Sequence, residues 1–231
     1  MTGERPVLPY PCLCLVTDPA VCPRDEMTQR VSAAVSGGVD VVQLRDKELP
    51  GAALLELAEE LKNAIRGRAL LLVNERVDVA VAAQVDGVQL GELGLPTDVS
   101  RRMLGDTPLI GRSVHSVEGA GDTVQSGADF LLVGTMFTTR SHPGEEPTGP
   151  GLLSRIKDAN ITKPMLGIGG ITEGNVGQVM SAGAQGIAVI TAVLADPNPG
   201  AAAERLKSAM ADGSAENTRM NQAAGLPVVP R

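Results

Sequence analysis

Two positive charges and an amide stand at alternate positions early in this sequence. Gln43, Arg45 and Lys47 are separated by single residues. Alternate residues of a strand share one face, so Gln43 and Arg45 lie together if a strand ends here, and Lys47 continues the spacing just beyond it. Arginine offers an anion a planar fork and lysine a point charge. We interpret the three residues as a cradle for a diphosphate; the alternative is a solvated rim in which the cations pair with Asp46 and Glu48.

A second polar pair, Asn74 and Glu75, follows another apolar run. Together an amide and a carboxylate could bind a diphosphate and a bridging Mg²⁺, because Mg²⁺ usually takes one or two carboxylates beside substrate phosphates. The alternative is local: Asn74 could cap a helix whose first turn favours the negative charge of Glu75. These two residues alone do not separate the two interpretations.

Two glycines, Gly169 and Gly170, end the apolar run that begins at Met165, and a second apolar run follows at 186–191. Backbone N–H groups at glycines can approach an anion because no Cβ intervenes. In a barrel of eight βα units, the last two strand ends commonly form a phosphate site. The stretch therefore predicts a second phosphate-binding position.

The histidines are His115 and His142. His115 lies two residues after Ser113 and could be a general base, although a structural hydrogen bond is the commoner role. His142 lies in the segment 138–151, which is long for a connection between a strand and a helix. This segment predicts a lid that could bring Thr139, Ser141 and His142 into the site; a surface loop without function is the alternative.

Eight strand-like runs alternate with eight helix-like runs, which is typical of a parallel sheet built from βα units. The expected strands are 13–17, 40–45, 69–73, 87–90, 109–113, 129–133, 164–168 and 186–190. The expected helices are 26–36, 53–65, 77–83, 98–104, 116–126, 152–159, 172–182 and 200–210. We predict an α/β fold, a single (β/α)8 TIM barrel over 1–212, with 213–231 as a disordered tail. An open doubly wound sheet is the alternative, which the lack of a G-x-G-x-x-G motif after the first strand disfavours.

Composition limits the function further. Of the 231 residues, 43% are hydrophobic and three are aromatic (one Tyr, two Phe), which predicts an aliphatic core. The net charge of −7 argues against general binding to nucleic acids or anionic membranes. The three cysteines form no disulfide-like framework, which fits a reducing compartment. No signal peptide or long apolar segment is evident, so we expect a cytoplasmic protein.

The motifs resemble those of the thiamine-phosphate synthase and TenI-type thiazole tautomerase superfamily. The matching stretches are 42–47, 73–80, 128–134, 167–171 and 183–193. The resemblance implies a barrel that binds small phosphorylated substrates; homo-oligomerisation is left open. Synthases of this superfamily join hydroxymethylpyrimidine diphosphate to thiazole phosphate and release pyrophosphate. Mg²⁺ and cations stabilise the leaving group, and the thiazole nitrogen attacks the pyrimidine carbocation.

The resemblance also assigns residues. Those expected to hold the pyrimidine diphosphate follow the second and third strands: Gln43, Arg45, Lys47 and Asn74. Those expected at the thiazole phosphate follow the last three strands: Thr139, Gly170, Ile190 and Thr191. The expected catalytic residues carry charge or lie near the reacting groups: Arg45, Lys47, Ser113 and His142. Glu75 is the expected ligand of Mg²⁺.

Three positions depart from the synthase pattern. Synthases have Asp in place of Glu75, a second metal-binding Asp in place of Gly94, and Lys in place of His142. Glu92 could substitute for the missing carboxylate and Arg140 for the missing cation.

Tautomerase relatives need no diphosphate cradle and use a histidine where Thr135 stands, so His115 or His142 would have to move the proton. The retained Gln43, Arg45 and Lys47 favour a thiamine-phosphate synthase. The altered metal residues leave two alternatives open, a tautomerase and a non-catalytic sensor of phosphorylated thiamine precursors.

Overall fold

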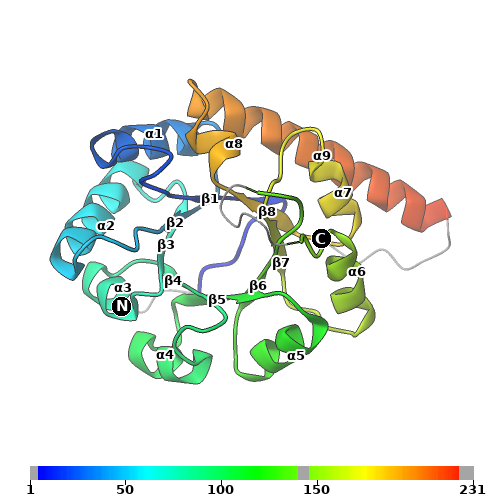
Figure 1. The fold of residues 1–231 in the computed structure, drawn as a ribbon, viewed down its shortest axis with the longest axis horizontal. Coiled ribbons are helices and arrows are strands. Elements are labelled where there is room, and N and C mark those ends of the chain that lie inside the picture. The colour runs from blue at the N-terminus through cyan, green and yellow to red at the C-terminus, as the bar shows by residue number, and fades with distance from the viewer. Residues whose placement is uncertain (1–4, 140–145, 224–231) are drawn as a thin grey trace.

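A computed structural model describes residues 5–139 and 146–223, in which eight parallel strands close into a barrel in chain order (Figure 1). The predicted TIM barrel is confirmed, and the open-sheet alternative is wrong because β1 pairs with β8. The strands are β1 (Cys12–Val16), β2 (Val41–Leu44), β3 (Leu70–Asn74), β4 (Gly87–Leu90), β5 (Leu109–Val114), β6 (Phe130–Val133), β7 (Met165–Ile168) and β8 (Gly186–Val189).

Helices surround the ring of strands (Figure 1). They are α1 (Arg24–Ser36), α2 (Gly51–Ile65), α3 (Val77–Ala83), α4 (Thr97–Leu104), α5 (Val117–Gln125), α6 (Gly151–Asp158), α7 (Val176–Ser181), α8 (Thr191–Leu194) and α9 (Pro199–Ala223). Within the described residues, no helix is long and apolar enough to span a bilayer.

The last helix, α9, is longer than the sequence analysis expected. It packs against α1, α7 and α8 and continues to Ala223, whereas we expected a helix over 200–210 and a disordered tail from residue 213. Pro199 suits the first helical position, and Ala, Glu, Met and Gln after residue 213 favour helix. The part of the expected tail at 224–231 lies outside the described residues.

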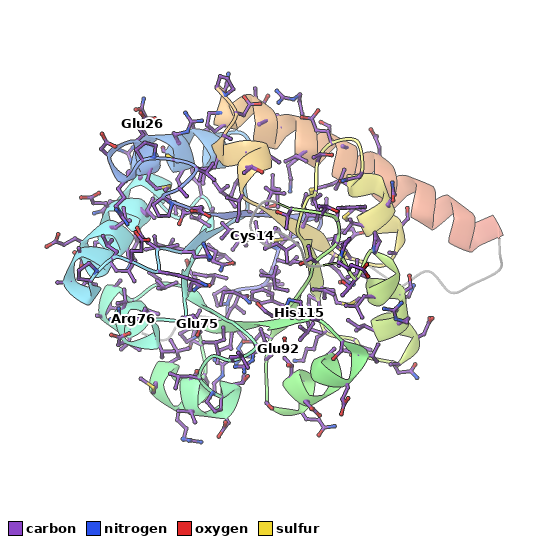
Figure 2. The ribbon with its side chains drawn as sticks, in the orientation of Figure 1. Cys14, Glu26, Glu75, Arg76, Glu92 and His115 are labelled. Carbon is purple, nitrogen blue, oxygen red and sulfur yellow. The ribbon has the colours of Figure 1, made fainter. Side chains whose placement is uncertain are left out.

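The buried side chains form two clusters, one inside the barrel and one between the strands and the helices. The interior cluster is aliphatic apart from Phe130 and the cysteines Cys12 and Cys14. Burial raises the pKa of the Cys12 thiol to about 12, and Cys12, Cys14 and Cys22 are free and buried. Figure 2 shows Cys14 in the middle of the ring. These thiols are therefore packing groups rather than nucleophiles.

Four side chains tie neighbouring strands together at their amino-terminal ends. The residue immediately before each even-numbered strand accepts a hydrogen bond from a backbone N–H of the preceding odd-numbered strand. These four clamps are Asp40 with Leu13 (2.7 Å), Asp86 with Leu71 (2.8 Å), Asp129 with Ile110 (2.8 Å) and Gln185 with Met165 (2.7 Å). The clamps satisfy backbone donors at the end of the barrel opposite the strand exits.

Replacing Asp129 by alanine should lower the free energy of unfolding by about 2–3 kcal/mol, because it removes the carboxylate partner of the Arg101 guanidinium and leaves the buried backbone N–H of Ile110 without its acceptor. Asp129 Oδ2 accepts from Arg101 at 2.6 Å as well as from Ile110, and Oδ1 accepts from Arg5 at 2.6 Å. Urea denaturation measures the change.

The matched control is Asp98→Ala. Asp98 forms an exposed ion pair with Arg102 at 2.8 Å on the surface of α4. Its loss should change stability by less than about 0.5 kcal/mol. Equal effects of the two substitutions would contradict the role given to Asp129.

Candidate active site

The carboxyl ends of the parallel strands open on one mouth of the barrel, where TIM-barrel enzymes carry their active sites. Gln43, near the end of β2, is 4% exposed and donates a hydrogen bond from Nε2 to Asn74 Oδ1 at 2.9 Å. Arg45 follows β2, and its backbone N–H donates to Thr17 Oγ1 at 2.8 Å. The structure therefore brings Gln43, Arg45 and Asn74 together at the ends of β2 and β3.

Arg45 and Lys47, the cations of the predicted cradle, do not pair with Asp46 and Glu48 as the solvated-rim interpretation required. Asp46 binds Arg24 at 2.6 Å instead, and this contact lowers the pKa of Asp46; Glu48 lies 3.7 Å from the same guanidinium. The Arg45 side chain is 27% exposed, and its guanidinium lies 3.5 Å from Asp18, just after β1. Lys47 is exposed. Arg45 thus retains solvent access for an anionic ligand.

Asn74 and Glu75 do not cap the helix that follows β3. The N-cap of α3 is Arg76 and no side-chain capping bond forms there, while the amide oxygen of Asn74 is held by Gln43. Glu75 has a φ of 63°, and its Oε1 accepts from the Gly91 N–H at 2.5 Å. The capping alternative is therefore wrong, and Glu75 reaches across to the loop after β4.

Gln89 and Ser113 extend the polar layer to β4 and β5. Gln89 Nε2 donates to Ser113 Oγ and to the Leu90 carbonyl, both at 3.2 Å. Gln89 is 2% exposed, and its Oε1 has no partner within the described part of the chain. Such an acceptor is costly to bury unpaired. From the sequence, Gln89 is expected among the polar residues at the barrel mouth, but the sequence assigns it no individual role; its alternation with Gly87 along β4 predicts that it faces the interior.

His115 is paired with Glu92. His115 Nδ1 lies 2.7 Å from Glu92 Oε2, and both side chains are about half exposed. Figure 2 shows the two side chains near the end of β5, with Glu75 nearby at the end of β3. A carboxylate beside Nδ1 orients the imidazole ring and leaves Nε2 for another partner. Glu92 is thereby engaged by His115 rather than free to replace a carboxylate at position 94.

The glycine-rich exit of β7 makes the second half of the mouth. Gly170 has a φ of 62°, and an ideal Cβ there would lie 2.5 Å from the Thr138 carbonyl oxygen. Its carbonyl accepts from Asn175 Nδ2 at 3.0 Å, which fixes the turn. Ile190 precedes the short helix α8, whose first residue, Thr191, is exposed. The first N–H groups of a helix have no intrahelical acceptor and can bind an anion.

The two halves of the mouth are neighbours in the ring. β8 pairs with β1 and β1 pairs with β2, so Thr191 and Arg45 follow strands that are separated by β1 alone. Thr139 is half-buried at the edge of the described residues. His142, Arg140 and the rest of segment 140–145, the middle of the predicted lid, lie outside them. The arrangement could hold two anionic groups side by side at one barrel mouth.

A family model and the sequences of known proteins both match most of this chain. The model of the thiamine monophosphate synthase family matches residues 13–193. A putative thiamine-phosphate synthase of Geobacter sulfurreducens is 43% identical over 190 residues, covering 81% of this chain and 88% of that protein. A thiamine-phosphate synthase of Haloarcula marismortui is 41% identical over 204 residues, covering 86% of this chain and 96% of that protein.

A solved structure agrees with these relatives. The thiamine phosphate pyrophosphorylase of Pyrococcus furiosus superposes with a TM-score of 0.79 at 33% identity, covering 87% of this chain and 96% of that one. The family model spans all eight strands, from β1 to the short helix after β8. This chain therefore belongs to the thiamine monophosphate synthase family.

Proposed function

We propose that this chain is a thiamine-phosphate synthase, which joins hydroxymethylpyrimidine diphosphate to thiazole phosphate and releases pyrophosphate. The observation that carries the proposal is the cradle of Gln43, Arg45 and Lys47 at the mouth, whose cations are not paired with Asp46 or Glu48. Relatives named thiamine-phosphate synthase at about 40% identity support it. A tautomerase, which acts on a substrate with one phosphate, has no use for a second phosphate-binding cradle.

The residues of the mouth would act chiefly by positioning and by charge. Arg45 and Lys47 stabilise the negative charge that grows on the pyrophosphate as its C–O bond to the pyrimidine methylene breaks. Gln43 and Asn74 hold the diphosphate in register, and Ser113 lies near the reacting carbon. Backbone N–H groups near Gly170 and Thr191 hold the thiazole phosphate, so that the thiazole nitrogen faces that carbon.

The residues present fit a Mg²⁺ ion shared with the substrate. Asn74 is the last residue of β3 and Glu75 follows it, and their amide oxygen and carboxylate are oxygen donors of the kind Mg²⁺ prefers. Within the described residues no three His, Cys, Asp or Glu side chains gather, so an ion held here would complete its shell with phosphate and water. Glu75 would hold the ion, whose chemistry there is neutralisation of the diphosphate.

One observation favours a second candidate. The pair of His115 and Glu92 is the kind of arrangement that transfers a proton, which a thiazole tautomerase needs.

The free cysteines also support a reducing compartment, and we place either activity in the cytoplasm.

Incubation of the purified protein with both synthase substrates, with and without Mg²⁺, separates the candidates. We expect pyrophosphate release that requires both substrates and Mg²⁺. Isomerisation of the thiazole carboxylate phosphate without pyrophosphate release would instead establish the tautomerase. Binding of the phosphorylated ligands with neither reaction would indicate the sensor.

A further inference from the structure

The Glu75 carboxylate occupies a space that two glycines leave open. The loop after β4 forms a tight turn, the 91–94 turn, in which the Gly94 N–H donates to the Gly91 carbonyl at 3.0 Å. The Gly91 N–H donates to Glu75 Oε1 at 2.5 Å. An ideal Cβ on Gly94 would lie 2.9 Å from Glu75 Oε1 and closer still to Oε2. The carboxylate therefore lies where a side chain at position 94 would begin.

The conformation of Glu75 shows that this placement is specific. Glu75 has a φ of 63°, in the region that residues with a side chain rarely adopt, and its N–H donates to the Gln89 carbonyl at 2.9 Å. Strained backbone of this kind persists where the surrounding structure holds it and is common at functional sites. The backbone of β3 and β4 thus aims the Glu75 side chain at the 91–94 turn.

The other carboxylate of this loop does not compete for the position. Glu92 is drawn away by His115, whose Nδ1 is 2.7 Å from Glu92 Oε2. Gly94 has a φ outside the left-handed region, so an alanine there meets no backbone strain of its own. Its first obstacle is the Glu75 carboxylate, the mobile end of a side chain.

We infer that Gly94 is a positioning residue for Glu75. Because residue 94 has no Cβ, the Glu75 carboxylate can reach from the end of β3 into the 91–94 turn. One carboxylate then serves as the acidic group of both the loop after β3 and the loop after β4. This inference rests on the proposed function for its link to Mg²⁺, although the packing it describes does not. It implies that in this chain, where residue 75 is a glutamate that reaches the 91–94 turn, a side chain at position 94 and the Glu75 carboxylate cannot occupy the same space.

The test compares Mn²⁺ binding in the presence of pyrophosphate, followed by electron paramagnetic resonance, in wild-type protein and variants. Gly94→Ala should displace the carboxylate and weaken Mn²⁺ binding about 10-fold or more, as the loss of supporting contacts does at other metal sites. Glu75→Ala should weaken it further. The double variant Glu75→Ala with Gly94→Asp should bind at least about 10-fold more tightly than Glu75→Ala, because the carboxylate returns from the other loop.

Thermal unfolding without metal gives a second readout. Gly94→Ala should lower Tm by about 2–4 °C through loss of the Gly91 hydrogen bond, but should cause no further loss in the Glu75→Ala background. Gly121→Ala in α5 is the matched control, since an added Cβ there meets nothing within 4 Å. It should leave Mn²⁺ binding unchanged.

The outcomes separate this inference from the proposed function. Wild-type binding by Gly94→Ala, or no rescue by the double variant, would overturn the inference while pyrophosphate release by the wild type still stands. If the wild type neither releases pyrophosphate nor binds Mn²⁺, the proposed function fails. The coupling of positions 75 and 94 in thermal unfolding then decides the inference alone, and additive Tm changes would overturn it.

Discussion

Replacement of Arg45 by alanine is expected to lower kcat/KM for thiamine phosphate formation by about 10²–10³-fold, the usual cost of removing one group that stabilises charge in a transition state. Arg45 is held at the mouth by the backbone contact with Thr17, and its guanidinium has Asp18 as a partner at 3.5 Å. That contact is long for an ion pair, so the fork can turn to a diphosphate. A continuous pyrophosphate assay measures the loss.

Two comparisons make this prediction specific. Arg45→Lys keeps the charge but loses the fork, and should recover part of the activity. Arg102→Ala, on the exposed face of α4, should leave activity at the wild-type level. A tautomerase would tolerate Arg45→Ala, so full activity of this variant would remove the main argument for a synthase.

Phe130→Ala is expected to cost about 3–5 kcal/mol of folding free energy, the range measured for large aromatic truncations in protein cores. Phe130 is 2% exposed and belongs to the cluster inside the barrel, where Gly111 on β5 makes room for its ring. The surrounding strands are hydrogen-bonded into a closed ring and cannot collapse into the cavity. Urea denaturation gives the change in stability.

An exposed apolar side chain provides the control. Met103 on α4 is 48% exposed, and Met103→Ala should change stability by no more than about 0.5 kcal/mol. A loss below about 1 kcal/mol for Phe130→Ala would mean that the barrel interior relaxes around the missing ring.

The sequence predicts the barrel well because most strand residues are buried, so that each strand reads as a short apolar run, such as Val41–Leu44 or the run that ends at Asn74. Once the strands are parallel, their polar ends must meet at one mouth. The position of Arg45 beside Gln43 therefore follows from alternation alone.

The contacts within the mouth depend on tertiary geometry that alternation does not describe. Asn74 could cap a helix by its sequence context, but Gln43 from the neighbouring strand engages it. Glu92 could replace a metal carboxylate by position, but His115, 23 residues later, binds it. The reach of Glu75 to Gly91 depends on a left-handed backbone that its residue type does not favour.

The four clamps repeat once for every two strands, so the smallest repeating unit of this barrel is a pair of βα segments. In each pair, the clamp lies at the amino-terminal ends of the strands, and the residues proposed to bind substrate lie at the carboxyl ends. The loops at the mouth can therefore change in sequence, and so in the substrate that they bind, without any change to the four clamps. A fold that separates its stabilising contacts from its binding residues in this way is well suited to support enzymes of different specificity on one scaffold.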